Sequence, residues 1–361
     1  MKILYGVCGF GLGHASRSVE IIRELSHEHE VLIISYDQAF DFLNEEFENV
    51  KKLEWFEIYY KDGAIHNFKT IVKNISRIPD IASSNFSQLV KIVRKFKPDV
   101  IVSDFEINSL FIGKLLNVPV ITVSNQHMLK FYDTEKNLEE RLFKHIPDLA
   151  AMLFFYPSHA LIVTTFLKPT KKYNKDTTFF FGPIVRQEFL RAKPKVNDFF
   201  VGYFNDQPIL EEFAYFFSNN FPDERLLLFG FKDKKSIGCV DCLPLDKKSF
   251  SKALIKCKGI FSHGGFSLLS EALLLKKPVC VCTSKNFYER YFNGLTAEKN
   301  SFGVLMNEFE YEKIDFFIKN TDFFSKKIAE AKIKPGNKDI ARKIIELGKK
   351  LKHLKRYALK R

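Results

Sequence analysis

The 361-residue chain lacks the features that mark membrane-spanning and secreted proteins. No run of about 18 apolar residues occurs, so no membrane-spanning helix is predicted. The N-terminus enters a strand pattern directly and shows no signal peptide, so we expect a cytoplasmic protein. The chain also has no internal repeat and no low-complexity tract, which leaves ordinary globular domains as the expectation.

The chain contains six cysteines, but their spacing predicts neither a disulfide framework nor a metal site. Three of the six cysteines lie in apolar runs that predict buried strands, where cysteine behaves as a small hydrophobic residue. Cys239 and Cys242 have the spacing of half a zinc site, yet only Cys257 follows at a remotely suitable distance. We therefore expect no structural zinc, no other metal and no bound cofactor.

What the chain does have is an alternation of short apolar runs with helical patterns. Its length corresponds to two domains at about 150 residues each, and 46% hydrophobic residues allow each half to bury a core. Gly182-Pro183 interrupts the alternation. We predict an α/β domain over residues 1–183, a second over 184–335 and a basic helix over 336–361, with parallel sheets in both domains. The predicted strands are residues 2–8, 31–35, 100–103, 119–123, 160–165, 199–203, 225–229, 258–261 and 279–282, with helices over 86–96 and 138–154.

A glycine turn near the C-terminal end predicts an anion site. An apolar run ends in His263-Gly264-Gly265, and a helical pattern containing Ser267 and Glu271 follows. Two glycines let the backbone approach a ligand, and a helix start offers unpaired N–H groups and a positive dipole end, which suits a diphosphate. Glu271, about one turn into the helix, could accept bonds from ribose hydroxyls. The alternative is an ordinary strand–helix turn with a satisfied histidine.

A second glycine-rich turn follows the first predicted strand. Gly9 and Gly11 fit the start of a G-x-G-x-x-G dinucleotide motif, but its third glycine position holds His14. A bulky imidazole there would obstruct close helix–strand packing, whereas it is well suited to a general base near neutral pH. We therefore interpret Gly11 and Gly13 as clearance for a substrate and His14 as functional. A helix-capping or packing histidine is the alternative.

Asp104 is the expected partner of His14. It ends the predicted strand over 100–103, and the carboxyl ends of parallel strands meet at one edge of a sheet. A carboxylate beside an imidazole fixes its tautomer and stabilises its protonated form. Asp104 could instead cap a helix that starts near Ile107.

Four motifs, in this order, resemble those of nucleotide-sugar glycosyltransferases with two Rossmann-like domains, the GT-B fold. They are the opening from Gly9 to Arg17, residues 100–104, residues 182–186, and residues 263–271. Within that class the chain most resembles the MurG-like and uncharacterised archaeal and bacterial group. The resemblance covers residues 1 to about 303.

The resemblance implies two facing domains with the active site in a cleft and a C-terminal helix that returns to the N-terminal domain. It also implies a nucleoside-diphosphate sugar, usually UDP-linked, and inversion without a metal. Loops at residues 59–79 and 125–127 are expected to face the acceptor. The implied site comprises His14 and Asp104 as catalytic residues, His263, Gly264, Gly265 and Ser267 at the diphosphate, Glu271 at the ribose, Glu289, Arg290 and Asn293 at the donor sugar, Gly11, Gly13, Arg17 and His127 near the acceptor, and Arg186 near the interdomain linker.

Two positions depart from the family pattern. Arg290 stands where glutamine is usual, which suggests either bidentate binding of an acidic sugar or an ion pair with Glu289 or another local acid. Lys276-Lys277 replaces the glycine usual before the proline, and we expect this pair on a surface turn with no consequence.

The formal charge of +13 suggests an acidic partner, although heavy use of lysine and phenylalanine could also reflect coding bias. Leu347, Leu351 and Leu354 form a stripe on a C-terminal helix that is otherwise rich in lysine. This helix could dock on the N-terminal domain, contact an anionic membrane surface, or do both. No interleaved aromatic and basic patch indicates nucleic acid.

These features predict an inverting, metal-independent hexosyl- or N-acetylhexosaminyltransferase at the inner face of the membrane. Its donor would be a UDP-sugar and its acceptor a hydroxyl of a lipid-linked or cell-envelope glycan. The alternatives are a UDP-sugar 2-epimerase of the same fold and a non-catalytic nucleotide-sugar-binding subunit. An NAD-dependent dehydrogenase is the weakest interpretation, because His14 replaces the motif glycine.

Overall fold

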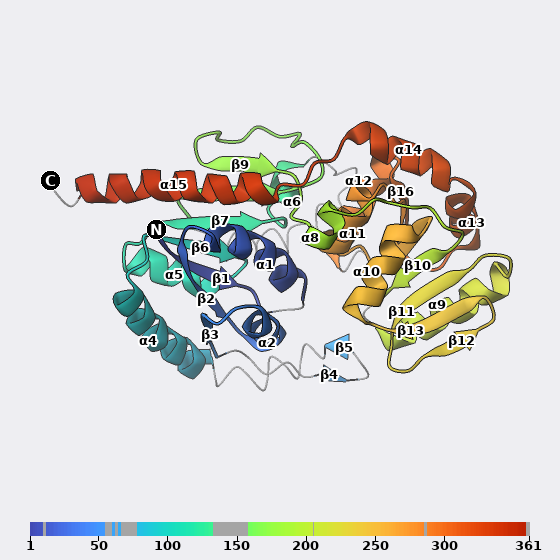
Figure 1. The fold of residues 1–361 in the computed structure, drawn as a ribbon, viewed down its shortest axis with the longest axis horizontal. Helices are drawn as coiled ribbons and strands as arrows, with labels where there is room; N and C mark the ends of the chain where they lie inside the picture. The colour runs from blue at the N-terminus through green and yellow to red at the C-terminus, as the bar shows by residue number, and fades with distance from the viewer. Residues whose placement is uncertain are drawn as a thin grey trace. The chain divides into compact units, whose positions relative to one another are not determined.

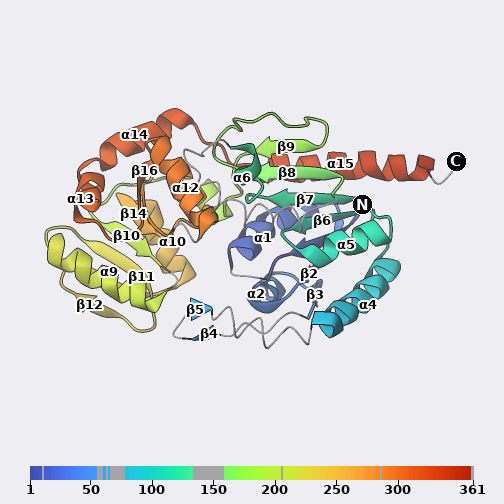
Figure 2. The ribbon, with the colours of Figure 1, turned by 180° about the vertical axis from the view of Figure 1, so that it is seen from behind.

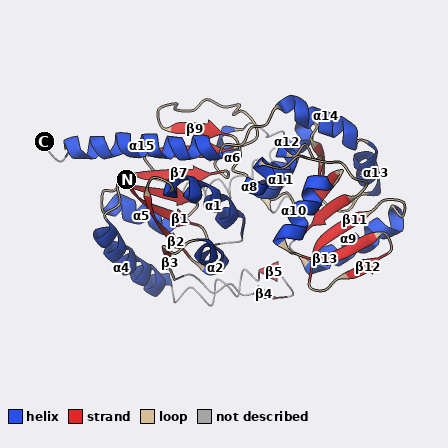
Figure 3. Cartoon of the chain, viewed as in Figure 1, coloured by secondary structure: helices blue, strands red, loops and turns tan. Residues whose placement is uncertain are grey.

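The chain folds into two compact units. The first contains the described residues up to Ile184 together with those from Gly336 onward, and the second runs from Val185 to Pro335. Each unit is a sheet with helices packed on it (Figure 3). The predicted helix over 138–154 lies outside the described residues, as does Gly11. The computed structural model describes residues 1–9, 12–54, 60–61, 64–65, 78–132, 158–204, 206–284 and 287–358.

The first unit is built on a seven-stranded sheet in which every neighbouring pair is parallel. Five strands match predicted ones, whereas β3 and β9 were not predicted. Val7 of β1 is in register with Asp104 of β6, so the carboxyl ends of these two strands lie side by side. In sheet order the strands are β3 (Val50–Lys52), β2 (Glu30–Ser35), β1 (Lys2–Val7), β6 (Val100–Asp104), β7 (Val120–Ser124), β8 (Ala160–Thr164) and β9 (Thr178–Phe181).

Helices cover both faces of this sheet (Figures 1 and 2). Ile3, Tyr5 and Val7 of β1 share a core with the helices on one face. Leu4 and Ile101 join a second core with the helices on the other face. Burial on both faces explains why β1 reads as a continuous apolar run. The first group of helices is α1 (Leu12–Ser26), α2 (Asp37–Glu46) and α15 (Asn337–Ala358), and the second is α4 (Ile78–Phe96) and α5 (Ile107–Leu115).

Helix α15 belongs to the first unit although it ends the chain (Figure 1). Ile340, Ile344 and Leu347 are buried in the core that α1 and β1 share. Near its end, the Nζ atom of Lys352 lies 2.6 Å from Asp99 Oδ1. Among the helices of the described ranges, none has both the length and the apolar character needed to cross a bilayer.

Shorter elements complete the first unit. Strands β4 (Tyr60–Lys61) and β5 (Ala64–Ile65) form an antiparallel ribbon. Helix α6 (Met128–Phe131) follows β7 directly. The turn between β7 and α6 therefore leaves the sheet at the same edge as the end of β6.

The second unit is also a seven-stranded sheet, parallel except for its edge strand β12. Its core is unusually rich in phenylalanine, with the rings of Phe200, Phe213, Phe217, Phe261 and Phe317 in mutual contact. In sheet order the strands are β12 (Lys235–Ile237), β13 (Val240–Pro244), β11 (Leu226–Phe231), β10 (Phe200–Tyr203), β14 (Gly259–Ser262), β15 (Val279–Cys282) and β16 (Gly303–Met306). The helices are α8 (Gln187–Leu190), α9 (Gln207–Asn220), α10 (Lys247–Lys256), α11 (Phe266–Leu274), α12 (Tyr288–Lys299), α13 (Tyr311–Lys319) and α14 (Thr321–Ala331). Two α/β units with parallel sheets confirm the predicted fold class.

Lys276 and Lys277 were both expected on a surface turn, and this expectation was wrong for Lys277. The side chain of Lys277 is only 2% exposed. Its ammonium group donates to the carbonyl oxygen of Cys257 at 2.6 Å and also to that of Lys195. These bonds let a buried lysine replace its water contacts with main-chain oxygens. Burial nevertheless lowers the pKa of Lys277 below its ordinary value.

Candidate active site

His14 and Asp104 meet at the edge where β1 and β6 end. His14 is the third residue of α1, and its Nδ1 atom lies 2.9 Å from Oδ1 of Asp104. The carboxylate is fully buried, whereas the imidazole side chain is 14% exposed. Phe105 stacks on the imidazole with ring centroids 5.5 Å apart. The pair therefore presents an accessible imidazole against a buried carboxylate.

Asp104 also binds two residues of α1. Arg17 Nε donates to Oδ2 at 2.8 Å while Arg17 Nη2 donates to Oδ1, and the Ser18 hydroxyl donates to Oδ2 at 2.8 Å. Burial by itself would raise the pKa of Asp104, but Arg17 and His14 hold it well below its usual range. The carboxylate is therefore ionised at any physiological pH. The alternative role of Asp104 as cap of α5 was wrong, because Glu106 caps that helix through the N–H groups of Asn108 and Ser109.

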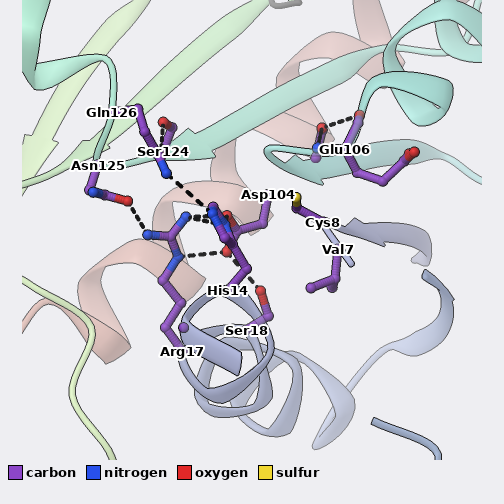
Figure 4. Close-up of polar contacts among 12 residues, drawn as sticks. Val7, Cys8, His14, Arg17, Ser18, Asp104, Glu106, Ser124, Asn125 and Gln126 are labelled. Carbon is purple, nitrogen blue, oxygen red and sulfur yellow. Dashed lines mark hydrogen bonds and ion pairs between the residues drawn. The ribbon is translucent and has the colours of Figure 1, made fainter. Parts of the chain in front are cut away.

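The turn after β7 completes the surroundings of His14 (Figure 4). The Ser124 hydroxyl donates to Gln126 Oε1 at 2.9 Å, and Gln126 Nε2 lies 3.2 Å from His14 Nε2. An amide nitrogen only donates and a carboxylate only accepts, so the contacts with Gln126 and Asp104 favour the tautomer that carries its proton on Nδ1, although the guanidinium of Arg17, another donor, also approaches this atom. The side chain of Arg17 donates to Asn125 Oδ1, and its Nη2 lies 2.8 Å from His14 Nδ1.

Sequence reasoning placed this turn near the acceptor but did not identify the contact of Gln126 with His14. The available signal was the polar run from Ser124 to His127 immediately after an apolar strand. Among the acceptor-side predictions, Arg17 is part of the network around His14. His127 follows Gln126 and is largely buried, and burial lowers its pKa to about 4, so it is neutral at pH 7. Gly13 lies in the first turn of α1.

The second unit contains the predicted glycine turn, between β14 and α11. Gly264 has a φ of +88°, and a Cβ atom there would lie 2.7 Å from the carbonyl oxygen of Arg290, so this position requires glycine. Asn293 Nδ2 donates to the Gly264 carbonyl at 3.0 Å, and the Gly264 N–H donates to the Ser262 hydroxyl. Gly265 is the N-cap of α11, and apart from its chain neighbours no atom of the described residues lies within 4 Å of the place where its Cβ would be. The turn is thus closely packed at Gly264 and open at Gly265.

His263 lies beside this opening. Burial and, to a smaller extent, the charge of Arg290 lower its pKa to about 3, so its imidazole is neutral at pH 7. Among the residues that the structure describes, none forms a hydrogen bond with its Nδ1 atom, although this atom is buried. A neutral imidazole carries one N–H, and its hydrogen bond with the Tyr203 main chain leaves Nδ1 as an acceptor, so the donors available to an anionic ligand here are the N–H groups at the amino end of α11.

The predicted donor-sugar residues lie on α12. Arg290 stacks on Phe287, with its guanidinium carbon 5.0 Å from the ring centroid. Burial lowers the pKa of Arg290, and the neighbouring Glu289 opposes this shift. Asn293 is 2% exposed and, as described above, holds the glycine turn. A contact of these residues with a sugar stays a prediction, as does a role for Ser267 in the first turn of α11.

Glu271, the predicted ribose residue, is held by Arg186. Arg186 Nε and Nη2 donate to the two carboxylate oxygens at 2.6 and 2.7 Å. Burial raises the pKa of Glu271, and Arg186 counteracts this shift. Sequence reasoning placed Arg186 near the linker but did not connect it with Glu271, because the two residues are far apart in the chain.

The chain has two α/β units with mostly parallel sheets. One unit carries a histidine–aspartate pair, and the other carries a glycine turn before a helix. Together with the family match, this identifies a glycosyltransferase of the GT-B class. The model of the family described as glycosyl transferase family 1 matches residues 1–322. The chain belongs to this family. The resemblance found in the sequence is thereby confirmed at the level of the class.

Relatives agree with this assignment. The chain is 21% identical over 336 residues to an uncharacterized glycosyltransferase of Methanosarcina mazei, covering 85% of this chain and 86% of the relative. A glycosyltransferase of Methanosarcina acetivorans matches with the same identity and coverage.

Solved structures share the fold. The glycotransferase of kitacinnamycin superposes with a TM-score of 0.68 at 17% identity, over 96% of this chain and 98% of that one. Phytolacca americana UGT2, complexed with UDP-2fluoro-glucose and pterostilbene, has a TM-score of 0.65 at 12% identity, over 96% and 99%. A UDP-glucosyltransferase from Polygonum tinctorium that glucosylates indoxyl has a TM-score of 0.67 at 11% identity, over 96% and 98%.

Proposed function

We propose that the protein moves a hexosyl or N-acetylhexosaminyl group from a UDP-sugar to a hydroxyl of a lipid-linked or cell-envelope glycan. The transfer inverts the anomeric centre and needs no metal. The observation that carries the proposal is the accessible His14 imidazole, hydrogen-bonded to the buried and ionised Asp104. Such a pair is suited to removing a proton from an acceptor hydroxyl.

In this mechanism the acceptor hydroxyl takes the place of the Gln126 amide as hydrogen-bond donor to His14 Nε2. The oxygen attacks the anomeric carbon as its proton moves to Nε2, and the bond from that carbon to the diphosphate breaks. UDP leaves with the electron pair of that bond. Asp104 stabilises the imidazolium that forms, and attack opposite to the leaving group inverts the configuration.

The second unit would hold the donor in this proposal. The open turn at Gly265 and the N–H groups at the start of α11 favour an anion, and His263 would lie beside it. Negative charge grows on the diphosphate as the bond breaks, and each well-placed donor could lower the barrier by about 3 kcal/mol. Glu271 would accept the ribose hydroxyls, and Arg290 and Asn293 would lie at the sugar.

The solved neighbours support the donor. One was complexed with a UDP-sugar analogue, and another is described as a UDP-glucosyltransferase. The net charge of +13 and the exposed lysines of α15 support an anionic membrane surface as partner, at the inner face of the cell membrane. The MurG-like subgroup stays a prediction.

The test begins with nucleotides and UDP-sugars screened by thermal shift, followed by mass spectrometry of products formed with polyprenyl-linked acceptors. Wild-type protein should form a glycosylated product, and His14→Ala should lower turnover by roughly 10²–10⁴-fold. Donor isomerisation without any acceptor would instead identify the 2-epimerase. Binding of UDP without turnover on any acceptor would identify a binding subunit.

A further inference from the structure

Arg186 has partners for its whole guanidinium group. Its Nε and Nη2 atoms bind the two oxygens of Glu271, and its Nη1 atom lies 3.2 Å from Glu188 Oε1. The guanidinium also stacks on Phe189, with its central carbon 4.7 Å from the ring centroid. Glu188 is held in turn by the hydroxyl of Ser251. All three guanidinium nitrogens and one face of the group therefore have partners.

This arrangement is largely buried. Glu271 is 4% exposed, and the side chain of Arg186 is 17% exposed. Phe189, on whose ring the guanidinium stacks, is itself buried at 2% exposure. A bidentate arginine fixes the plane of a carboxylate as well as its position, which a lysine cannot do.

The carboxylate of Glu271 retains capacity for further hydrogen bonds. Two carboxylate oxygens offer about four acceptor positions; the bonds to Arg186 Nε and Nη2 use one on each oxygen, and the Arg186 main-chain N–H uses a third. Glu271 is the sixth residue of α11, about 7.5 Å along the axis from the first. That separation is comparable to the distance between the diphosphate and the ribose of one nucleotide.

We propose that Arg186 is a positioning residue that orients Glu271 to accept the 2′- and 3′-hydroxyl groups of the donor ribose. This inference rests on the proposed function, because it takes the diphosphate to lie at the start of α11. Arg186 itself need not touch the nucleotide. Without it, Glu271 could turn or become protonated and would lose its selectivity for a ribose diol.

Arg225 provides a matched control in the same unit. Its Nη2 atom donates to Asp241 Oδ2 at 3.0 Å, so it also forms an arginine–carboxylate pair. The side chain of Arg225 is 64% exposed, however, and this residue precedes β11, whereas the glycine turn follows β14. Changing it removes an ion pair without altering the surroundings of Glu271.

The test compares the affinities of the full chain for UDP, 2′-deoxy-UDP and 3′-deoxy-UDP by calorimetry. Wild-type protein should bind UDP about tenfold more tightly than at least one deoxy analogue, as expected for a hydrogen bond to a charged group. Arg186→Gln should reduce this ratio to less than about threefold, mainly by lowering the affinity for UDP. Arg186→Lys should give an intermediate ratio, and Arg225→Lys should keep the wild-type ratio.

The outcomes separate this inference from the proposed function. If Arg186→Gln weakens all three nucleotides by the same factor, or leaves the ratio unchanged, Arg186 has only a structural role and the inference is overturned. If Arg186→Gln does not fold, the ratio measured for Arg186→Lys decides in the same way. Wild-type protein that binds UDP without preferring it to either analogue also overturns the inference. Failure of the wild type to bind UDP overturns the proposed donor itself.

Discussion

Asp104 combines complete burial with charge, so removal of its charge should affect stability as well as turnover. Its pKa in the folded chain is lowered from an ordinary value of 3.8, and Arg17 is the main group that counteracts burial. A carboxylate of this kind stabilises the fold above its unfolded pKa, and this contribution is lost as the pH falls toward the folded pKa. The stabilisation is therefore complete at neutral pH and declines only in acid.

We expect Asp104→Asn to lower the free energy of unfolding at pH 7 by about 3 kcal/mol, because it leaves Arg17 buried without its anionic partner. Below about pH 4 the free energy of the variant should change less with pH than that of the wild type. Urea titrations between pH 3 and pH 7 would measure both effects. Asp241→Asn, which removes a carboxylate from the exposed pair with Arg225, is the control and should change stability little. Parallel pH curves for Asp104→Asn and the wild type would contradict the argument.

Gln126 allows a test of which nitrogen of His14 acts as the base. Its amide nitrogen donates to Nε2, so the lone pair is held where an acceptor hydroxyl would bind. In Gln126→Glu a carboxylate would face Nε2 and favour a proton there, and turnover should fall by about 10²-fold. Gln126→Met has a similar size but no polar group, and it should keep most of the activity. Nitrogen NMR of the His14 ring would report the tautomer in each variant, and equal turnover of the two variants would exclude this role.

At the scale of single elements, α11 ends in a strained conformation. Lys276 follows the helix with a φ of +60°, in the left-handed region that favours glycine. Lys276 belongs to the pair that replaces the glycine usual before the proline. Lys276→Gly should therefore raise the free energy of unfolding by about 1 kcal/mol, as measured by urea denaturation.

Lys252 is the matched control for that substitution. It is an exposed lysine inside α10, where the backbone is helical. Lys252→Gly should lower stability by about 1 kcal/mol, because glycine is a poor helix former. If both substitutions lower stability equally, the backbone at Lys276 carries no strain.

The elements show why the sequence predicted some features and missed others. The central strands, such as β1 and β6, were predicted because both of their faces are buried and most of their residues are apolar. Edge strands such as β3 (Val50–Lys52) and β12 (Lys235–Ile237) are short and partly exposed, so their residues carry no distinctive pattern.

The same reasoning applies to the site. The approach of His14 to Asp104 was predicted, because strand ends in a parallel sheet meet at one edge whatever the loops do. The contact of Gln126 with His14 depends on the exact path of the turn after β7, which no periodicity encodes. Lys277 was expected at the surface because lysine is rarely buried, and its two carbonyl partners become visible only in three dimensions.

At the scale of the whole molecule, the C-terminal helix links the chain's last residues to its first unit. Ile340, Ile344 and Leu347 lie in one core with β1, so the first unit depends on residues that follow the whole of the second in the chain. The opposite side of α15 includes the exposed Lys349 and Lys350. The two roles suggested by the sequence, docking and membrane contact, therefore fall on different sides of one helix.

This separation allows the two roles to be tested independently. Ile344→Ala should lower the free energy of unfolding by about 3 kcal/mol, because it leaves a cavity in the shared core. The double substitution Lys349→Glu and Lys350→Glu should change stability little but should reduce binding to vesicles that contain anionic lipid, and the difference should shrink as salt is added. Urea denaturation and vesicle sedimentation measure the two properties. If the double substitution leaves vesicle binding unchanged while Ile344→Ala destabilises the chain, α15 serves only to complete the first unit, and the membrane role proposed for its basic side is wrong.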